Sequence, residues 1–538
     1  MSAPSIPQPA TALSLAATVA EAAVRFGDAP AVVRWDGASL SYHRWWAQAQ
    51  RVAGWMARRG VGEGDRVALV LPSGLEYLVA GAAASALGAA TAGVNPSLAP
   101  RERAVLVELA DPRLVLADSL LAEGLPGERL VELVRPSEPD RAPWQAELEM
   151  AGATVGTPLG DAPAPRSDRT AALVFTSGTT GLPKAARFTE GALAAIARLD
   201  LGEAAGRWGG AGPMFVSTQF AHIGLSTKLC WYVRSGARLH LVQRWRADEV
   251  LGLVAGQRMA TIGAVAPQVA LMLRSPLMGD LDLSAVRLLI VGGAASPPAM
   301  VAEARKRFGA GYTIRYSSTE SGGCGLATPP WPEHEDDDLT IGVPRAGIEA
   351  SVRDDEGAEL PQGELGELWI RTPSAMAGYW DAPEATAATL VDGWLKTGDL
   401  ARRDALGRFS LAGRRSDMYI RGGYNVFPAE VEAVLADHPG VAEVAVAPRT
   451  DQVMGEVGVA VVVPRAGAAT PCLADLRTHG EGRLARHKLP ESMVVVDRLP
   501  LGATGKVDRR ALADLVAGNA LDAPQAGAEP GEGGGSAT

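Results

Sequence analysis

A segment rich in glycine and hydroxyl groups is the first place where this sequence could do chemistry. The apolar run Ala171–Phe175 leads directly into Thr176-Ser177-Gly178-Thr179-Thr180-Gly181-Leu182-Pro183-Lys184. Glycine turns leave backbone amides free to point at phosphate oxygens, and the hydroxyl groups and the lysine add donors and positive charge. The spacing does not fit the Walker A pattern. A phosphate-binding loop and a flexible surface loop therefore both remain compatible with this segment.

Two carboxylates and one lysine are further candidates, because the carboxylates stand in loops at strand ends and the lysine stands on a glycine turn. Glu320 ends the segment Tyr316–Glu320, Asp399 ends Thr397-Gly398-Asp399, and Lys506 follows a glycine turn. A carboxylate at a strand end can bind Mg²⁺, or it can accept hydrogen bonds from the hydroxyl groups of a ribose. Taken singly, such residues are more often solvated turn residues, so none of the three assigns a function alone.

The elements that must position these residues follow an alternating pattern. Ser41 suits the N-cap of a helix that ends at Arg58-Arg59-Gly60. The buried face of this helix is expected to consist of Trp45, Ala49, Val52, Ala53 and Met56. Short apolar runs at Val67–Leu71 and Val286–Val291 suit buried strands. Helices that alternate with buried strands predict an α/β fold with mainly parallel sheets.

The second half of the chain is expected to differ from the first. Within residues 343–413, the segments Glu349–Arg353 and Leu365–Arg371 alternate like antiparallel strands, which predicts a β-rich subdomain. We expect a large N-terminal domain at 1–414, a small α+β domain at 415–518 and a disordered tail at 519–538. Strands near Val441–Ala447 and Val457–Val463 and a helix at Ala429–Ala436 should form the small domain.

Length, charge and cysteine content limit the partners of the chain. A chain of 538 residues is too long for one core, and its formal net charge of −10 comes without a basic arm or stripe, so nucleic acid is not expected as a partner. Three scattered cysteines, Cys230, Cys324 and Cys472, suit a reducing cytoplasm. The uncharged stretch Tyr77–Leu98 is rich in alanine and glycine, which favours a buried helix over a membrane span.

Six segments, taken together and in order, resemble the superfamily of acyl-CoA synthetases, peptide-synthetase adenylation domains and beetle luciferases. These segments are Thr176–Lys184, Tyr316–Glu320, Gly363–Trp380, Thr397–Asp399, Gly413–Glu432 and Gly505-Lys506. The resemblance extends from about residue 13 to residue 513, and it looks most like the acyl-CoA ligases. It implies a ligase that uses ATP to form an acyl-adenylate, releases pyrophosphate, and then forms a thioester with coenzyme A. It also implies that the small C-terminal domain is mobile.

The resemblance assigns the phosphate and catalytic roles to particular residues. It implies that the β- and γ-phosphates of ATP are wrapped by Thr176, Ser177, Gly178, Thr179, Thr180, Gly181 and Lys184. Thr319 would contact the α-phosphate, while Glu320, together with Thr179, would hold Mg²⁺. Lys506 resembles the lysine that bridges the reacting carboxylate and the α-phosphate during adenylation.

The same resemblance implies the adenosine site. Tyr316 would stack on adenine, with the turn at Gly293 and Ala294 on the other side of the base. Asp399 would bind the ribose hydroxyl groups, and Arg414 would reach the ribose or phosphate beside it. These roles come from matching positions only, and the sequence alone does not bring the residues together.

The resemblance also implies an acid pocket, a tunnel for the thiol and a hinge, and some of their residues have an alternative explanation. His222 matches a position beside the acid pocket, although a satisfied core histidine fits it equally well, and Ser317 and Gly322 belong to segments that line the pocket in relatives. Gly422 and Gly423 match a segment that lines a tunnel for the pantetheine arm, although they could simply form a turn. Ser416 falls at the hinge, where relatives usually carry Asp or Lys.

The acid and its acceptor stay open at this point. Coenzyme A is the expected acceptor, with a carrier-protein thiol or an amine as alternatives. The substrate is expected to be a small-molecule acid, for which a fatty acid, an aryl acid, an amino acid and a small oxyanion such as nitrite are all compatible with the nucleotide motifs. A catalytically silent nucleotide-binding relative is a further alternative, against which the joint presence of Lys184, Glu320, Asp399 and Lys506 argues. Oligomeric state is not readable from the sequence.

Overall fold

The chain divides into two compact units. The computed structural model describes residues 10–133, 162–176, 183–216, 218–242, 244–294, 296–481, 483–502 and 506–518. Its N-terminal unit is Met1–Leu411 and its C-terminal unit is Ala412–Thr538, so the division falls inside strand β20 (Phe409–Arg414). The expected boundary after Arg414 lies at the end of the same strand. The expected architecture, a large α/β part with several sheets and a small second part, is confirmed.

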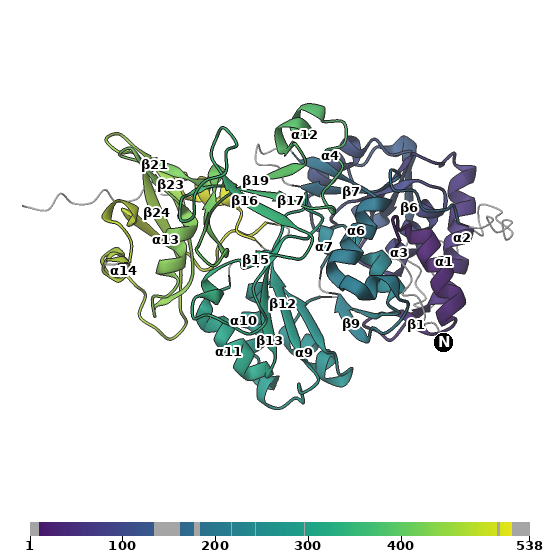
Figure 1. Ribbon diagram of the computed structural model, residues 1–538, viewed down its shortest axis with the longest axis horizontal. Helices are drawn as coiled ribbons and strands as arrows, with labels where there is room; N and C mark the ends of the chain where they lie inside the picture. The colour runs from purple at the N-terminus through teal and green to yellow at the C-terminus, as the bar shows by residue number, and fades with distance from the viewer. Residues whose placement is uncertain are drawn as a thin grey trace, which may run out of the picture. The chain divides into compact units, whose positions relative to one another are not determined.

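The first part of the N-terminal unit consists of two sheets with helices packed between them (Figure 1). A four-stranded sheet has the order β2-β1-β10-β9, and a six-stranded sheet has the order β6-β5-β3-β4-β7-β8. The strands of the first sheet are β1 (Pro30–Val33), β2 (Ser39–Ser41), β9 (Pro213–Val216) and β10 (Arg238–Leu241). The strands of the second are β3 (Arg66–Val70), β4 (Ala90–Gly93), β5 (Leu114–Asp118), β6 (Leu130–Leu133), β7 (Thr170–Thr176) and β8 (Lys184–Thr189). All pairs are parallel except β1–β2 and β7–β8, as the alternation predicts.

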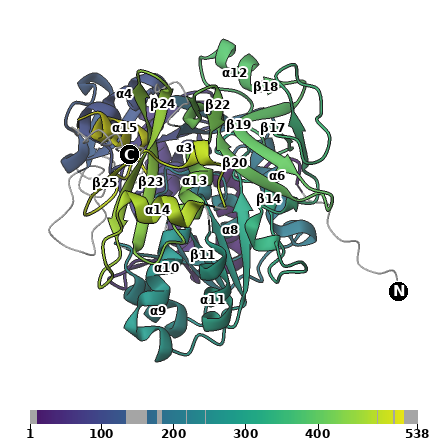
Figure 2. The ribbon, with the colours of Figure 1, turned by 90° about the vertical axis from the view of Figure 1, so that its left-hand side faces the viewer.

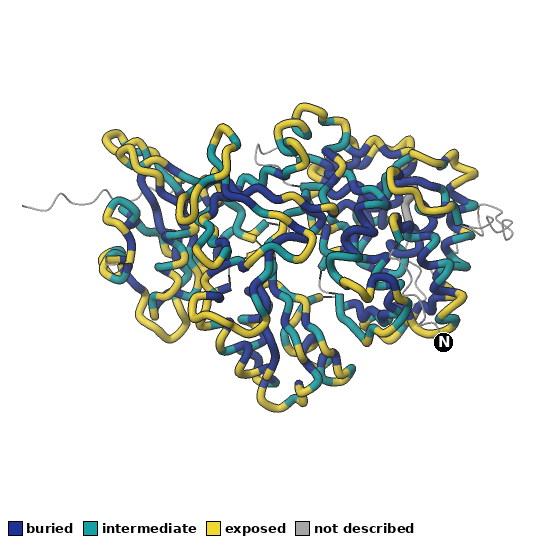
Figure 3. Tube along the Cα trace, in the orientation of Figure 1, coloured by how far each residue is buried: buried dark blue, intermediate teal, exposed yellow. Residues whose placement is uncertain are grey.

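The helices of this part cover both faces of the six-stranded sheet. The layer between the sheets is made of α1 (Leu15–Phe26), α2 (Tyr42–Arg58), α3 (Leu75–Ala86) and α8 (Leu229–Arg234). On the opposite face lies α4 (Pro100–Ala110), whose Leu106 and Val107 pack on Ala68 and Val115. Figure 3 shows these central strands buried and the connecting turns exposed.

The local sequence pattern predicted the cap, the buried face and the end of helix α2 correctly. The side chain of Ser41 accepts a hydrogen bond from the amide of Arg44 at 3.2 Å, so it caps the helix as expected. All five residues of the expected face are buried. The helix ends at Arg58, and Gly60 follows with φ of 80°. The local pattern was sufficient here because periodicity and capping residues agree.

The expectation of one buried helix across Tyr77–Leu98 is wrong in its length. Helix α3 ends at Ala86, and residues 90–93 form the buried strand β4. The break falls at Leu87 and at Gly88, whose φ of 71° no helix accepts. Alanine-rich sequence carries little periodicity, so the turn could not be seen from hydropathy. In the described part of the chain, no helix combines the length and the hydropathy that a bilayer crossing requires.

Two further sheets complete the N-terminal unit. A five-stranded sheet of order β11-β12-β13-β14-β15 packs against three helices that gather at its lower side in Figure 2. Its strands are β11 (Thr261–Ala264), β12 (Leu288–Gly292), β13 (Gly311–Tyr316), β14 (Leu326–Ala327) and β15 (Val343–Pro344). Its helices are α9 (Ala247–Gly256), α10 (Ala266–Arg274) and α11 (Pro298–Phe308).

The β-rich subdomain is antiparallel, as expected. Its sheet has the order β16-β17-β19-β18, with β20 on β19. Its elements are β16 (Glu349–Arg353), β17 (Gly366–Arg371), α12 (Pro383–Thr389), β18 (Leu390–Val391) and β19 (Trp394–Arg403). The inner face, with Val352, Leu368 and Ile370, packs on α6 (Glu190–Leu201), the helix that follows β8.

The C-terminal unit is a five-stranded sheet with helices on both faces. Its elements are β21 (Tyr419–Arg421), β22 (Tyr424–Val426), α13 (Pro428–Leu435), β23 (Val441–Asp451), β24 (Gly455–Pro464), α14 (Leu473–Gly480), β25 (Ser492–Val495) and α15 (Arg509–Gly518). Side chains of β24 alternate, so Ala460 and Val462 pack with α13 and α14, while Val459 and Val461 pack with α15. The expected strands and helix of this unit are confirmed.

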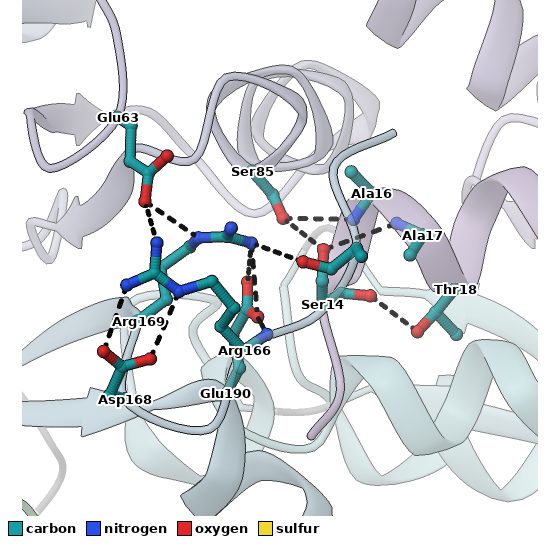
Figure 4. A network of polar contacts seen from close by, with 11 residues as sticks. Ser14, Ala16, Ala17, Thr18, Glu63, Ser85, Arg166, Asp168, Arg169 and Glu190 are labelled. Carbon is teal, nitrogen blue, oxygen red and sulfur yellow. Dashed lines mark hydrogen bonds and ion pairs between the residues drawn. The ribbon is translucent and has the colours of Figure 1, made fainter. Parts of the chain in front are cut away.

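A buried ion pair joins the two ends of the β7–β8 hairpin (Figure 4). Arg169 directly precedes β7, and Glu190 directly follows β8. Their side chains are 7% and 3% exposed, and Nη1 of Arg169 lies 3.4 Å from Oε1 of Glu190. The amide of Arg166 donates to Oε2 of Glu190 at 2.7 Å, and the amide of Glu190 donates to the carbonyl of Arg169 at 2.9 Å. Burial raises the pKa of Glu190, whereas these partners stabilise its charged form.

We expect Glu190→Ala to lower the free energy of unfolding of the N-terminal unit by about 3–5 kcal/mol, because it leaves Arg169 buried without its carboxylate. All twelve tryptophans precede residue 412, so urea unfolding followed by tryptophan fluorescence reports on this unit alone. Glu63→Ala is the matched control, since Glu63 faces the same two arginines but is 57% exposed. Its unfolding midpoint should change little. Equal losses in the two variants would contradict the role of burial.

Candidate active site

The hairpin of β7 and β8 carries the first two site residues. Thr176 ends β7 and pairs in register with Lys184, which begins β8. The predicted phosphate-binding residues Ser177, Gly178, Thr179, Thr180 and Gly181 fall between them and lie outside the described residues. The hydroxyl oxygen of Thr176 is buried and has no hydrogen-bond partner within the described chain. A buried hydroxyl group without a partner is one that a ligand can satisfy.

A second segment lies along the other edge of β8 and brings Tyr379 to Lys184. The carbonyl of Ala185 accepts from the amide of Trp380 at 2.8 Å, and Ala186 and Tyr379 form an antiparallel bridge. Nζ of Lys184 lies 5.0 Å from the centre of the Tyr379 ring, within the range of a cation–π contact. The lysine is thereby held between its cross-strand partner and an aromatic ring.

Tyr379 also holds Glu320. Its hydroxyl group donates to Oε1 of Glu320 at 2.9 Å. Burial, together with the negative charge of Glu320, raises the pKa of Tyr379, so the phenol stays protonated and remains the donor. The backbone of Glu320 is fixed as well, because its carbonyl accepts from the amide of Met376 at 2.8 Å. Lys184, Tyr379 and Glu320 thus form one connected group.

The turn that presents Thr319 and Glu320 is stabilised by two serines. The amide of Ser318 donates to Oγ of Ser321 at 3.0 Å, and the amide of Ser321 donates to Oγ of Ser318 at 3.1 Å. This reciprocal pair closes the turn that follows β13. Thr319 and Glu320 are half-buried at its tip, where they can meet a ligand.

Tyr316 and Asp399, the residues expected to bind adenosine, lie in direct contact. The hydroxyl group of Tyr316 donates to Oδ2 of Asp399 at 2.5 Å, although the residues are 83 positions apart. Asp399 is 7% exposed, and its amide donates to Oγ1 of Thr397 at 3.1 Å. Gly398 has φ of 73°, which turns the chain so that Asp399 points inward. The structure therefore places the expected adenine and ribose residues side by side.

The turn expected on the other side of adenine follows β12. Gly293 and Ala294 are exposed, and Gly293 has φ of 79°. Strand β12 is parallel to β13, with Gly292 opposite Arg315. Because the carboxyl ends of parallel neighbours meet at one edge of a sheet, this turn and Tyr316 share that edge.

The predicted residues of the acid pocket differ in burial. His222 is exposed and caps the short helix α7 (Ile223–Ser226), with its Nδ1 accepting from the amide of Gly224 at 3.2 Å, so the alternative of a core histidine is wrong. Ser317 is exposed. Gly322 is buried with φ of 73°, and a Cβ atom there would lie 2.4 Å from the carbonyl oxygen of Ser374. Close packing thus explains this glycine, and its role in the pocket stays a prediction.

The remaining predicted residues belong to the C-terminal unit. Lys506 and Arg414 are exposed, and the carbonyl of Lys506 accepts from the amide of Gly502 at 2.7 Å. Gly422 and Gly423 form the exposed turn between β21 and β22, with φ of 56° and 85°. Ser416 is exposed and donates to Oδ1 of Asp417 at 3.0 Å. The functional roles of these residues remain predictions.

The residues around Glu320 suit Mg²⁺ that arrives with a nucleotide. Within the described ranges, no group of three or more His, Cys, Asp or Glu side chains could hold a metal ion. Mg²⁺ usually binds proteins through one or two carboxylates and completes its coordination with water and substrate phosphates. A single fixed carboxylate beside a lysine fits that mode. It does not fit a resident metal centre.

Comparison with known proteins agrees with this geometry. A family model described as "AMP-binding enzyme" matches residues 19–380, and the model "AMP-binding enzyme C-terminal domain" matches residues 430–506. The chain belongs to the AMP-binding enzyme family. More narrowly, it is an AMP-forming enzyme of the acid–CoA ligase type, since curated relatives of that activity match nearly its whole length.

Three relatives illustrate the range of the family. The indoleacetate–CoA ligase of Aromatoleum aromaticum is 33% identical over 90% of this chain and 95% of its own. The structure of the amide bond synthetase McbA from Marinactinospora thermotolerans is 26% identical, with a TM-score of 0.79 over 93% of this chain and 99% of its own. O-succinylbenzoate coenzyme A synthetase from Bacillus subtilis, in complex with ATP and magnesium ion, is 27% identical, with a TM-score of 0.77 over 92% and 99%.

Sequence reasoning gave Tyr379 no role. The residue lies in the matched segment Gly363–Trp380, but nothing local indicates that its hydroxyl group reaches Glu320, 59 positions away. A tyrosine inside a segment shared with the family was the available signal.

We expect Tyr379→Phe to lower kcat/KM for pyrophosphate release about 10-fold or more, because it removes a hydrogen bond to a charged carboxylate, which is worth about 1.5–3 kcal/mol. The Mg²⁺ concentration for half-maximal rate should rise in parallel. Tyr42→Phe is the matched control, since the buried hydroxyl group of Tyr42 donates to the carbonyl of Ala237 at 2.8 Å, away from the site. That variant should lose stability and keep its Mg²⁺ dependence. If Tyr379→Phe shows wild-type Mg²⁺ dependence, Tyr379 does not position Glu320.

Proposed function

We propose that this enzyme activates a carboxylic acid as its adenylate with Mg²⁺-ATP and transfers the acyl group to the thiol of coenzyme A. The observation that supports this most is the convergence of Lys184, Tyr379 and Glu320, together with the Tyr316–Asp399 pair, in one unit of an AMP-binding enzyme. The first group suits the phosphates and their metal ion. The second suits adenosine.

The first step is displacement at phosphorus. An oxygen of the substrate carboxylate attacks the α-phosphorus, the bond from that phosphorus to the bridging oxygen of the β-phosphate breaks, and pyrophosphate leaves. Both reactants are anions, so positive charge must offset their repulsion. Lys184 supplies such charge at the outer phosphates, and Lys506 supplies it between the carboxylate and the α-phosphate. Glu320 would hold the Mg²⁺ that arrives with ATP, and this ion would neutralise further charge and help to align the attacking and leaving oxygens.

The second step is acyl transfer. The sulfur of the thiol attacks the acyl carbon of the adenylate, the bond to the phosphate oxygen breaks, AMP leaves, and the thiol proton passes to solvent. Coenzyme A is proposed as the acceptor because curated relatives that cover 90% of this chain include CoA ligases such as the indoleacetate–CoA ligase. Exposed Gly422 and Gly423, which have no side chains, suit the passage of a narrow pantetheine arm.

Lys506 is proposed to serve the first step alone. It lies in the C-terminal unit, whereas Glu320, Tyr316 and Asp399 lie in the N-terminal unit. Adenylation needs the lysine at the α-phosphate, but thiol attack on the adenylate does not. We therefore propose that the C-terminal unit moves between the steps about a hinge at Ser416, which is exposed.

We expect Lys506→Ala to lower adenylate formation at least about 100-fold, and to spare thioester formation from acyl-AMP that is supplied ready-made. The two half-reactions are followed separately, by pyrophosphate release and by loss of free CoA thiol. Lys488→Ala is the control in the same unit, since Lys488 pairs with Glu430 and belongs to neither step. Equal loss of both half-reactions in Lys506→Ala would contradict the assignment.

The acid and the acceptor are tested together. Fatty, aromatic, amino and small inorganic acids are offered in turn, and AMP and pyrophosphate are measured with CoA, a carrier protein or an amine present. We expect acid-dependent AMP formation, with a thioester formed from CoA. An amide as the main product would contradict CoA as the acceptor and would favour amide bond synthesis, the activity for which McbA is named. Absence of AMP with every acid would overturn it.

A further inference from the structure

Four charged side chains that the nucleotide chemistry does not use gather beside the turn that carries Glu320. Nζ of Lys228 lies 2.6 Å from Oδ2 of Asp200, and Nη1 of Arg345 lies 3.0 Å from Oδ1 of the same carboxylate. The three side chains are 16%, 12% and 14% exposed. They come from three elements: Asp200 from α6, Lys228 from the residue before α8, and Arg345 from the residue after β15.

Arg315 is the fourth member of this charged cluster. It lies in β13, directly before Tyr316, and is half-buried. Its Nε atom is buried and has no hydrogen-bond partner in the described chain. Burial, together with the positive charge of Arg345, lowers the pKa of Arg315. The negative charge of Asp200 acts in the opposite direction and raises this pKa. A buried guanidinium donor without an acceptor is unfavourable, because it has lost water and gained nothing in return.

The cluster has an excess of positive charge. Lys228, Arg315 and Arg345 are cations, whereas Asp200 is the single anion among the four, so these groups carry two positive charges in excess. Asp200 and Lys228 stabilise each other's charged forms, which lowers the pKa of Asp200 and raises that of Lys228. Asp200 and Lys228 are therefore both charged at neutral pH. Buried positive charge of this kind is stabilised by an anion that brings its own oxygens.

The cluster borders the residues expected to receive the acid. A Cβ atom at Gly323 would lie 3.6 Å from Cε of Lys228 and 3.7 Å from Cγ1 of Ile223, which follows His222. Gly323 itself stands three residues after Glu320. The absence of a side chain at Gly323 thus leaves the stem of Lys228 beside the turn that presents the reacting centre. Nucleotide binding is assigned to the opposite side of β13, where Tyr316 meets Asp399.

We propose that the acid activated by this enzyme carries a second carboxylate at its far end, and that Arg315 and Lys228 bind it. This inference rests on the proposed function and names its substrate class, a dicarboxylic acid. One carboxylate reacts at the α-phosphorus. The other carboxylate accepts hydrogen bonds from the guanidinium of Arg315 and so provides the acceptor that Nε of Arg315 lacks. It also forms an ion pair with Lys228. An acid ending in a methyl group would leave Nε of Arg315 without an acceptor.

The test compares acids of equal carbon number that end in a methyl group or in a carboxylate, in straight-chain and aromatic series. Acid-dependent pyrophosphate release gives kcat/KM for each member. At the best chain length, the wild-type enzyme should prefer the diacid about 10-fold or more. Arg315→Met and Lys228→Met should each lower that preference about 10-fold or more, mainly through KM of the diacid. Arg274→Met, which removes an exposed arginine at the end of α10, is the control and should keep the wild-type preference.

Thermal unfolding gives a readout that does not depend on turnover. Arg315→Met loses no hydrogen bond of Nε, so its midpoint without ligand should equal or exceed that of the wild type. A diacid should raise the midpoint of the wild type, because it binds the folded state, and should raise that of Arg315→Met much less. This variant is sufficient for the test if Lys228→Met, which breaks a buried ion pair, does not fold.

The outcomes separate this inference from the proposed function. Turnover of monoacids at least as fast as of diacids overturns the dicarboxylate inference and leaves adenylation intact. An unchanged preference in Arg315→Met also overturns it. No pyrophosphate with any acid overturns the proposed function, and the inference falls with it.

Discussion

Strand pairing along β8 determines where the charged groups of the site lie. On one edge of β8, the register with β7 places Thr176 opposite Lys184. On the other edge, the pairing with the segment before α12 brings Tyr379 to the same lysine. A shift of one residue on either edge would turn these side chains to the other face. The ion pair between Arg169 and Glu190, at the far end of the hairpin, opposes such a shift because both partners are buried.

Much of the fold could be predicted, because its signals are local. The cap and the buried stripe of α2 lie within one helix, and the alternation of β16 and β17 lies within one hairpin. Resemblance placed Tyr316 and Asp399 at one adenosine site, but no local pattern contains their contact, which spans 83 positions. Local periodicity failed at Tyr77–Leu98, where alanine-rich sequence hides the turn at Gly88.

What could not be predicted consists of long-range polar contacts. Tyr379 reaches Glu320, and Arg345 reaches Asp200 across 145 positions, but a tyrosine or an arginine in the sequence does not indicate which group it will meet. The same holds for exposure. A core position fitted His222 as well as a position beside the acid pocket, yet the residue caps a short helix at the surface, because capping depends on where the chain turns.

Positive charge in this enzyme has two separate physical reasons. The lysines assigned to the nucleotide must offset phosphate charge for any acid, so their positions follow from the shared chemistry and can be read from segments common to the family. Lys228, Arg315 and Arg345 are drawn from three elements and exceed the one carboxylate between them. Burying such an excess is unfavourable unless a ligand compensates it. The residues that determine which acid reacts should therefore be sought among charges that the fold leaves uncompensated, because stability alone does not explain their presence.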